Sequence, residues 1–354
     1  MKSLMVNLPG REYRILIERG ILEDAGSHIR TVVRGSRLVV ITDKHVDDRY
    51  GATLLLSLEE NGFEVRFITV APGEKSKSLR TLEAVCEEIM DFGLTRIDAV
   101  VALGGGVIGD LAGFAAAVAL RGVDFIQIPT TLLAQVDSSV GGKVAVNLKA
   151  GKNLLGAFHQ PKLVLIDPDC LESLPERVYR DGMAEVIKCG AIMDRGLFAR
   201  LEQYKGRAEL MEDVESVIMD CCSIKLRLVE QDEQDNGVRM LLNFGHTLGH
   251  AYEKAFGYGK FTHGEAVAAG MCRITAWSEK EGLTEKGTFE RLRSLILRYG
   301  LPCEIKADLE DIEDALGLDK KGEGDRLKLV LLKEIGRSFL HQTTKKEFVK
   351  ELES

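Results

Sequence analysis

The stretch Val100-Val-Ala-Leu-Gly-Gly-Gly-Val-Ile-Gly-Asp110 decides the fold class, because an apolar run there enters three consecutive glycines and continues as a helical pattern. Glycines allow backbone N–H groups to approach a phosphate closely, and the start of a helix adds a favourable dipole. The pattern differs from the usual GxGxxG fingerprint, so a tight strand–helix turn without a ligand is the alternative. We interpret the stretch as a phosphate- or dinucleotide-binding turn, since three consecutive glycines exceed what a turn requires.

Short β-branched runs alternate with amphipathic helical stretches on both sides of this turn. Such alternation, with nearly continuous apolar strands, is typical of a parallel sheet covered by helices on both faces. We therefore predict a Rossmann-like α/β domain. Its expected strands are residues 37–42, 64–70, 99–103, 125–129 and 163–167, and its expected helices are residues 46–61, 78–92 and 108–119.

The second half of the chain has a different pattern, in which helical periodicities dominate until a β-branched run at residues 328–332. A chain of 354 residues favours two domains, because a single core rarely grows beyond about 250–300 residues. We predict an α/β domain at residues 1–172 and a mainly α-helical domain at residues 173–354. Since open α/β sheets bind ligands beyond the carboxyl ends of their strands, a second domain at that edge would form the catalytic cleft. The expected helices of the second domain are residues 178–193, 197–204, 209–230, 246–255, 264–280 and 287–298.

The overall composition argues against several classes of protein. A net charge of −8 disfavours a general nucleic-acid-binding protein, and an anionic substrate would need local clusters of lysine and arginine. Residues 1–14 lack the apolar run of a signal peptide, and the longest apolar stretches fall short of the ~20 residues of a membrane span. The seven cysteines include no CxxC pair and are typical of reduced thiols. We expect a cytoplasmic protein that contacts no membrane.

Two further segments of the first domain carry residues suited to anionic or nucleotide ligands. Asp43 ends a predicted strand, where a carboxylate can bind a ribose hydroxyl or, equally well, cap a helix. Residues 129–153 form a long segment rich in glycine, serine and threonine, in which Lys143 and Lys152 could neutralise a phosphate or carboxylate. A surface loop with solvated lysines is the alternative interpretation of that segment.

Three histidines of the second domain indicate a metal site. His246 and His250 stand four residues apart on one helical face, and His263 opens the next expected helix. An acidic ligand is expected as well, and Glu185 is a candidate on an otherwise apolar helix. Histidine with carboxylate and no cysteine suits Zn²⁺ with positions left open for substrate oxygens. Spacing alone would pair His246 with His250 and does not distinguish Glu185 from Glu265. A helix-capping histidine pair is the alternative interpretation.

Together, these segments resemble the 3-dehydroquinate synthase family of sugar phosphate cyclases over nearly the whole chain. Seven blocks occur in the order and spacing of that family, which makes the resemblance far more specific than any one motif. The blocks are residues 104–110, 129–131, 137–143, 151–153, 182–188, 239–250 and 263–267.

The resemblance implies a role for each matching residue. The implied metal ligands, for Zn²⁺ or Co²⁺, are Glu185, His246 and His263, which displaces the pairing of His246 with His250. The implied NAD contacts are Asp43, Glu74, Lys77, Gly105, Gly106, Val107, Gly109, Asp110, Thr130, Thr131, Lys143, Lys152 and Ser173, the last at a position where threonine is common. The implied catalytic residues are Lys143, Lys152, Lys188, Arg239, Asn243 and His250, the last either supporting the metal ligands or handling a proton.

The implied substrate is a small anionic molecule bound by residues of both domains. Its contacts would be Asp137, Lys143, Lys152, Asn153, Glu185, Lys188, Lys225, Arg239, Asn243, His246, His250, His263 and one of Lys320 and Lys321. The family also borrows an arginine from the partner subunit of a homodimer, and Arg121 matches that residue.

The activity that the resemblance implies is conversion of 3-deoxy-D-arabino-heptulosonate 7-phosphate to 3-dehydroquinate and phosphate, in the shikimate pathway of aromatic amino-acid biosynthesis. It proceeds by transient oxidation with NAD, β-elimination of phosphate, reduction and intramolecular aldol closure. Three alternatives stay open: another sugar-phosphate cyclase, a metal-dependent polyol dehydrogenase that releases NADH, and a non-catalytic nucleotide- or metal-binding protein. Arg239 and Asn243 favour the substrate that carries a carboxylate.

Overall fold

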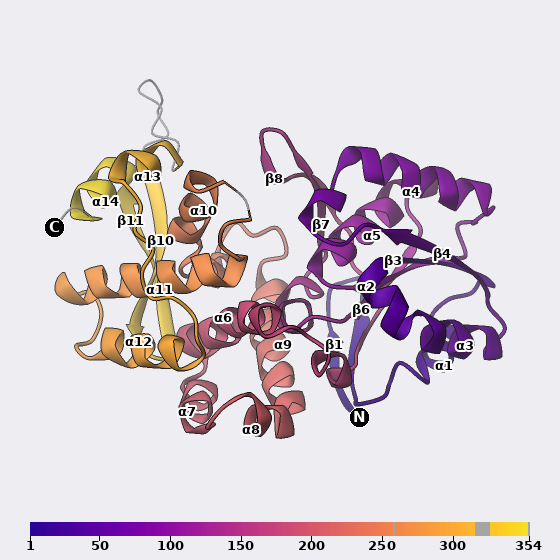
Figure 1. Cartoon of the computed structure of the whole chain (residues 1–354), viewed down its shortest axis with the longest axis horizontal. Coiled ribbons are helices and arrows are strands. Elements are labelled where there is room, and N and C mark those ends of the chain that lie inside the picture. The colour runs from indigo at the N-terminus through magenta and orange to yellow at the C-terminus, as the bar shows by residue number, and fades with distance from the viewer. Residues whose placement is uncertain (258, 316–325, 353–354) are drawn as a thin grey trace. The chain divides into compact units, whose positions relative to one another are not determined.

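The computed structural model describes residues 1–257, 259–315 and 326–352, and the chain divides into two compact units, Met1–Pro175 and Glu176–Ser354 (Figure 1). The first is called the sheet unit below and the second the helical unit. The predicted fold class is confirmed, because a Rossmann-like parallel sheet is followed by a mainly helical part. Within the described residues, the helices are too short or too polar to cross a bilayer.

The sheet unit is built on seven strands, of which all neighbours are parallel except the edge pair β1–β2. Their order across the sheet is β1 (Lys2–Val6), β2 (Tyr13–Ile17), β9 (Leu163–Ile166), β6 (Asp124–Pro129), β5 (Ala99–Gly104), β3 (Arg37–Asp43) and β4 (Glu64–Val70). Both faces of this sheet are buried. Along β3, Leu38 and Val40 belong to one apolar cluster and Val39 and Ile41 to another, which explains the continuous apolar run in the sequence.

Helices supply the two apolar covers of this sheet. One cover includes α1 (Ala25–Arg30) and α3 (Ala52–Glu60), and the other includes α4 (Leu79–Asp91) and α5 (Gly106–Val118). The antiparallel hairpin of β7 (Lys143–Leu148) and β8 (Gly151–Phe158) packs on α5.

The order of the strands reverses between β3 and β5. From β3 the chain runs to β4 on one side, and then crosses to β5 on the other side. Ligands of open α/β sheets bind at such a switch point, outside the carboxyl ends of the strands. Asp43 ends β3 and Gly104 ends β5, so the acidic residue and the glycine turn that were singled out in the sequence meet at this point.

The helical unit is dominated by long helices: α6 (Glu176–Met193), α7 (Arg195–Gln203), α8 (Arg207–Glu212), α9 (Val214–Gln231), α10 (His246–Ala255), α11 (His263–Lys280), α12 (Thr288–Arg298), α13 (Leu309–Ala315) and α14 (Lys345–Leu352). Residues 182–192 of α6 are all buried, which makes this helix central to the core. Helix α11 packs across the hairpin of β10 (Arg326–Glu334) and β11 (Arg337–Thr344) (Figure 1).

Several predicted elements were wrong in detail. The helix expected at residues 46–61 is divided into α2 (Lys44–Val46), the π-helical turn Asp47–Gly51 and α3, while that expected at 209–230 breaks between α8 and α9. The segment expected as a long loop at residues 129–153 contains the turn Ala134–Ser138 and most of the β7–β8 hairpin. Strands β1, β2 and β11 were not predicted; β1 and β11 are largely exposed or half-buried, so they lack a long apolar run.

Candidate active site

Three side chains from three helices of the helical unit converge on one point. Ligand atoms of Glu185 on α6, His246 on α10 and His263 on α11 all lie within 4.8 Å of one another. The Nε2 atoms of His246 and His263 are 3.7 and 3.8 Å from Oε1 of Glu185. Spacing alone had paired His246 with His250, whereas the structure groups His246 with Glu185 and His263.

The carboxylate of Glu185 is fully buried without the hydrogen bonds that a buried carboxylate normally has. Among the described residues, neither of its oxygens accepts a hydrogen bond of good geometry. The ammonium of Lys188, one turn along α6, contacts Oε2 as an ion pair. Because a buried carboxylate is costly unless it is fully paired, a carboxylate whose Oε1 atom faces two imidazoles while Oε2 is held by an ammonium fits a bound cation.

The imidazoles of His246 and His263 are oriented through their other nitrogen. Nδ1 of His246 lies 3.1 Å from the carbonyl oxygen of Phe244, and Nδ1 of His263 lies 3.4 Å from Oε2 of Glu253. Since these acceptors favour a proton on Nδ1, Nε2 of each ring presents a lone pair toward Glu185. Two such nitrogens and one carboxylate form a donor set that suits Zn²⁺ with an open position.

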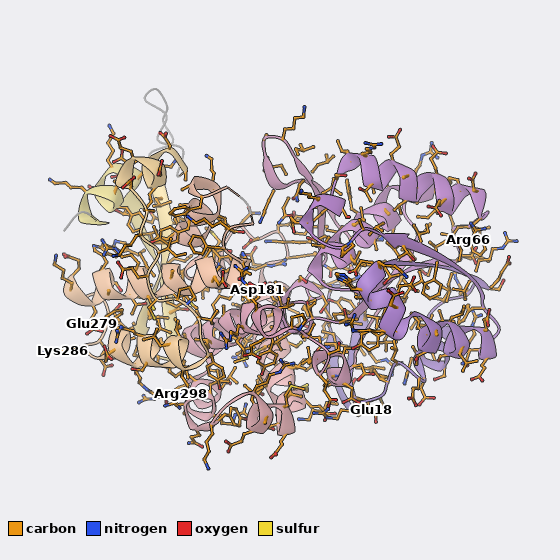
Figure 2. The ribbon with its side chains drawn as sticks, viewed as in Figure 1. Glu18, Arg66, Asp181, Glu279, Lys286 and Arg298 are labelled. Carbon is orange, nitrogen blue, oxygen red and sulfur yellow. The ribbon has the colours of Figure 1, made fainter. Side chains whose placement is uncertain are left out.

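The position of His263 is set by the start of α11. Thr262 and Glu265 form a reciprocal capping box, in which each side chain accepts a hydrogen bond from the other's backbone N–H. Arg177 of α6 donates to both oxygens of Glu265 at 2.9 and 2.8 Å, and Asp181 of α6 (Figure 2) accepts from the backbone N–H of residue 264. The helix that carries Glu185 therefore also anchors the helix that begins with His263. Glu265, the alternative ligand candidate, is used in this anchoring.

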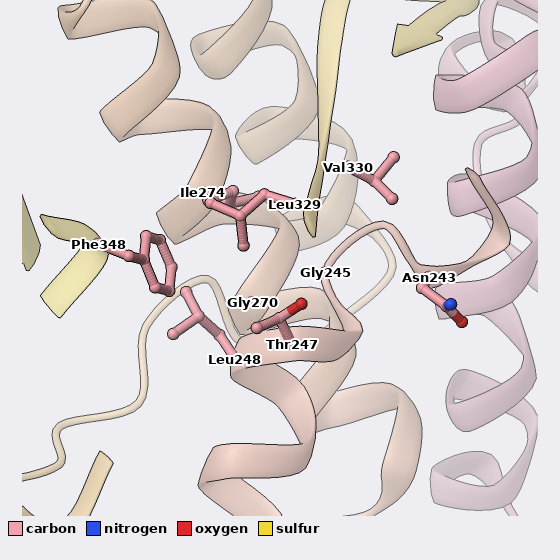
Figure 3. Close-up of a pocket in the computed structure, with 9 residues that line it drawn as sticks. All are labelled: Asn243, Gly245, Thr247, Leu248, Gly270, Ile274, Leu329, Val330 and Phe348. Carbon is pink, nitrogen blue, oxygen red and sulfur yellow. The ribbon is translucent and has the colours of Figure 1, made fainter. Parts of the chain in front are cut away.

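The position of His246 depends on close packing of α10 against α11. Gly245 has φ +78°, and a Cβ atom there would lie 2.7 Å from the carbonyl oxygen of Val267. A Cβ at Gly270 would in turn lie 2.2 Å from the carbonyl oxygen of Gly245. Figure 3 labels both glycines beside a small cavity, and Asn243 points away from the apolar side chains that line it. Without glycine at these positions, α10 could not bring His246 so close to α11.

His250 completes a group of three rings. Its ring centroid lies 5.5 Å from that of His246 and 6.0 Å from that of His263, and its side chain is exposed. Burial lowers the pKa of His246 well below its ordinary value, and the nearby cation of Lys188 adds to this effect. Burial also works to lower the pKa of His263, but its hydrogen bond to Glu253 and the charge of Glu185 outweigh this effect, so that pKa is raised. His246 is therefore held in the neutral form that can bind a metal ion.

In the sheet unit, the candidate nucleotide site is the switch point at the ends of β3 and β5. Oδ1 of Asp43 accepts from the backbone N–H groups of His45 and Val46, so this carboxylate caps a helix. Gly105 is the N-cap of α5 and offers no side-chain cap, which leaves the N–H groups of the first turn directed outward. Thr130, at the end of β6, donates its backbone N–H to the carbonyl oxygen of Gly104 at 3.0 Å.

The glycines of this turn are required by packing inside the protein as well as by any ligand. A Cβ atom at Gly105 would lie 2.9 Å from Thr131, and one at Gly109 would lie 2.8 Å from Gln127. At Gly106 the nearest atom is the hydroxyl of Ser138 at 3.0 Å, and this side chain can rotate away. Gly106 is therefore the position at which ligand approach can be tested with the least change to the fold.

A polar network ties the turn of residues 74–77 to α5 and to the β7–β8 hairpin. The buried ammonium of Lys77 donates to Asp110 on α5 and to Asn153 on β8. Asn147 on β7 donates to Glu74 at 2.6 Å and accepts from the backbone N–H of Asn153 at 2.9 Å. Lys77, Asp110, Glu74 and Asn153 were all singled out in the sequence. Asn147 was not predicted from the sequence. Only its position six residues before Asn153, within the segment already singled out, could have indicated it.

The remaining predicted residues lie at several places. Arg121 is exposed with φ +67°, Asp137 lies in the turn Ala134–Ser138, and Ser173 makes a 2.7 Å hydrogen bond with Tyr50. In the hairpin, Lys143 is exposed and Lys152 is half-buried. In the helical unit, Lys225 and Arg239 are buried, and Arg239 donates to the carbonyl oxygen of Glu233 at 2.7 Å. Lys320 and Lys321 lie outside the described residues.

Comparison with known proteins identifies the family. The family models for the N-terminal and C-terminal domains of 3-dehydroquinate synthase match residues 67–181 and 182–322. The chain belongs to the 3-dehydroquinate synthase family. The resemblance stated from the sequence is thereby confirmed. At 51% identity, the 3-dehydroquinate synthase of Clostridium acetobutylicum aligns over 353 residues, which is 99% of each chain.

Two solved structures of other synthases share the fold of this 3-dehydroquinate synthase family member over nearly its whole length. A 2-deoxy-scyllo-inosose synthase complexed with carbaglucose-6-phosphate, NAD⁺ and Co²⁺ is 28% identical, with a TM-score of 0.89 over 99% of both chains. The 2-epi-5-epi-valiolone synthase of Streptomyces hygroscopicus, with NAD⁺ and Zn²⁺ bound, is 26% identical, with a TM-score of 0.86 over 96% of this chain and 95% of that one. Each of these relatives thus binds NAD⁺ together with one of the two divalent metals expected here.

Proposed function

We propose that this protein is a 3-dehydroquinate synthase, which converts 3-deoxy-D-arabino-heptulosonate 7-phosphate to 3-dehydroquinate and phosphate. The observation that carries the proposal is the buried carboxylate of Glu185, whose Oε1 atom faces His246 and His263, in a chain that belongs to this family. Full-length similarity to a named synthase at 51% identity favours this substrate over those of the other cyclases. Arg239 and Asn243, as predicted contacts of a carboxylate, support the same choice.

The proposed metal ion is Zn²⁺ or Co²⁺, held by Glu185, His246 and His263. A divalent ion bound there would polarise substrate oxygens and lower the pKa of hydroxyl groups. The chain itself supplies Lys188, whose ammonium is already in contact with Glu185, and the exposed imidazole of His250 beside both ligand histidines. We assign proton transfer to His250, because it can exchange protons with water without giving up a metal-ligand position.

The proposed nucleotide is NAD, at the carboxyl ends of β3 and β5. The uncapped N–H groups at the start of α5 suit a pyrophosphate, and Asp43 stands where a carboxylate can bind a ribose hydroxyl. Only one oxygen of Asp43 takes part in its two capping bonds. Its structural role and its proposed role in binding are therefore compatible.

The proposed substrate carries two anionic groups, and the chain offers cations to match. Lys188, Lys225 and Arg239 are buried in the helical unit, where Lys188 contacts Glu185 and Arg239 donates to the carbonyl oxygen of Glu233. Lys143 and Lys152 lie on the β7–β8 hairpin of the sheet unit. We propose that these residues hold phosphate and carboxylate in one orientation, so that the oxidised intermediate stays bound while phosphate leaves.

We also propose that the protein acts as a cytoplasmic homodimer in which Arg121 reaches the active site of the partner subunit. Leu120 and Arg121 both have positive φ, at +50° and +67°, and Arg96 donates to the carbonyl oxygen of Leu120 at 3.0 Å. Two consecutive non-glycine residues with positive φ are costly in conformational energy, and such strain is typical of a functional segment. The turn presents an exposed guanidinium.

The decisive experiment follows NAD during turnover. Because the hydride is returned in each cycle, one NAD⁺ per enzyme should support many turnovers, with one phosphate released per substrate and no accumulating NADH absorbance. Product is identified by mass, which separates dehydroquinate from an inosose or a valiolone. NADH formed in proportion to the substrate consumed would replace this proposal with a polyol dehydrogenase.

A second experiment tests the assignment of cations to the substrate. Lys152→Ala and Arg239→Ala should each raise KM for the heptulosonate phosphate by about 30-fold or more, because removing one partner of a charge-assisted contact costs at least about 2 kcal/mol. NAD affinity should change far less for Arg239→Ala. Equal losses of NAD and substrate affinity in that variant would contradict the assignment. Lys205→Ala, in the exposed turn after α7, is a matched control.

A further inference from the structure

Helix α10 carries a third ionisable side chain on the face of its two histidines. Glu253 follows His246 by seven residues and His250 by three, so all three lie on one face of the helix. Its side chain is only 6% exposed, and its Oε2 atom lies 3.4 Å from Nδ1 of His263 on α11. A carboxylate is seldom buried to this degree unless it is paired.

The two ligand histidines have different partners at Nδ1. His246 faces the carbonyl oxygen of Phe244, a neutral acceptor of its own chain segment, at 3.1 Å. His263 faces an anionic acceptor from a different helix. A carboxylate makes the stronger hydrogen bond and increases the basicity of the opposite ring nitrogen.

We propose that Glu253 is a positioning residue for metal binding, which accepts the Nδ1–H of His263 and thereby directs Nε2 of that ring toward Glu185 and the metal ion. This inference rests on the metal site of the proposed function. It assigns to α10 a second task besides supplying His246, because the same helix then sets the tautomer and orientation of a ligand on α11. No direct contact of Glu253 with the metal ion is required.

The same side chain could instead belong to a second cation site, since His250, Glu253 and His263 also bring ligand atoms within 4.8 Å of one another. The geometry favours the hydrogen bond. Nε2 of His263 faces Glu185 and Nδ1 faces Glu253, so occupation of both sites would require one imidazole that has lost both protons. A neutral imidazole can bind one metal ion and donate one proton, which matches the two neighbours that His263 has.

The experiment is a Co²⁺ titration of the metal-free, full-length protein, followed by the visible absorbance of the bound ion. The wild type should bind one Co²⁺ per chain. Glu253→Ala should bind it about 10–100-fold more weakly, and Glu253→Gln should be intermediate, because its amide oxygen still accepts the proton without the charge. Glu202→Gln is the matched control: it removes a carboxylate of the same unit that receives two 2.7 Å hydrogen bonds from Arg291.

A second readout separates orientation of His263 from general damage to the fold. In the Co²⁺ form, the Nδ1 protons of His246 and His263 should give two shifted, exchangeable proton resonances. Glu253→Ala should lose the resonance of His263 to rapid exchange with water and keep that of His246. Circular dichroism of the metal-free Glu253→Gln protein should match that of the wild type.

Three results would overturn the inference. Unchanged Co²⁺ affinity in both Glu253 variants, with both resonances kept, would show that Glu253 does not position His263. Two Co²⁺ per wild-type chain, one of them lost in Glu253→Gln, would make Glu253 a metal ligand. A wild type that bound no Co²⁺ would remove the proposed metal site together with this inference, whereas the first two results would leave that site in place.

Discussion

Buried carboxylates have different partners in the sheet unit and in the helical unit. In the sheet unit, Asp98 accepts hydrogen bonds from Arg37 and Thr95, and Asp167 accepts from the backbone N–H groups of Gly20, Leu22 and Asp169. In the helical unit, Glu185 is fully buried and faces Lys188 and two imidazoles.

The difference distinguishes structural from functional burial of charge. A carboxylate that accepts backbone N–H groups holds chain segments together, and its loss should appear as lost stability. A carboxylate that faces ionisable side chains, without hydrogen bonds of good geometry from the described residues, is arranged for a cation.

The sheet unit also builds its candidate site largely from backbone and glycine, whereas the helical unit builds its site from side chains. Single substitutions should therefore act differently in the two units.

The largest expected effect is loss of a metal ligand. His263→Ala should lose the metal ion and lower kcat on the order of 10³-fold, since a catalytic metal ion contributes several kcal/mol to transition-state stabilisation. Metal content and phosphate release measure the two losses. His341→Ala is the control, because it removes an imidazole that packs against Trp277, far along α11 from His263. A metal-free His263→Ala protein with full activity would break the comparison.

An intermediate effect, on stability alone, is expected at Asp98. Asp98→Asn should destabilise the protein by about 1–3 kcal/mol in urea unfolding, because the amide cannot accept all of the N–H and O–H groups that meet this carboxylate. Metal affinity should be unchanged. Asp48→Asn is the control: it alters an exposed ion pair with Lys44 and should not measurably change the midpoint of urea unfolding. Loss of metal affinity without loss of stability in Asp98→Asn would contradict the distinction.

The stabilising contribution of the Asp98 carboxylate should depend on pH. Burial works to raise the pKa of Asp98, but the hydrogen bonds from Thr95 and from the backbone of Arg37 outweigh it, so the pKa lies below its ordinary value. Its stabilising contribution is therefore present above the unfolded-state pKa of about 3.9 and is lost as the pH falls through the lower folded-state value. The wild type should therefore have the larger free energy of unfolding above about pH 4, and the difference from Asp98→Asn should disappear only below that pH.

The smallest expected effect concerns the glycine turn. Gly106→Val should weaken NAD binding by at least about tenfold, or 1.4 kcal/mol, while the metal affinity stays the same. The substitution places a side chain at the start of α5, where the pyrophosphate is proposed to bind. Gly206→Ala is the control, because a Cβ atom there has no neighbour within 4 Å. Unchanged NAD affinity by calorimetry would make the turn purely structural.

Much of the fold could be predicted from the sequence, because buried parallel strands and amphipathic helices leave periodic apolar patterns. The order of the strands could not, since it depends on long-range pairing that no local pattern encodes. The same limit applies to the site. Local spacing pointed to His246 and His250, whereas the grouping with His263 depends on the anchoring of α11 by Arg177 and Asp181 of α6. Glu253 lay on the same helical face as both histidines and was nevertheless missed.

The pairing of Lys77 would couple the proposed nucleotide site to the β7–β8 hairpin. Its ammonium is shared between Asp110, at the end of the glycine turn, and Asn153, on the hairpin that carries Lys152. If the proposed nucleotide draws Lys77 or Asp110 toward itself, the contacts of Asn153 would change, and the affinity of the hairpin for the proposed anion would change with them. Thermodynamic linkage makes the effect reciprocal: the anion must change the affinity for the nucleotide by the same factor. Cooperativity between the proposed nucleotide and the proposed anion would then pass through the buried side chain of Lys77.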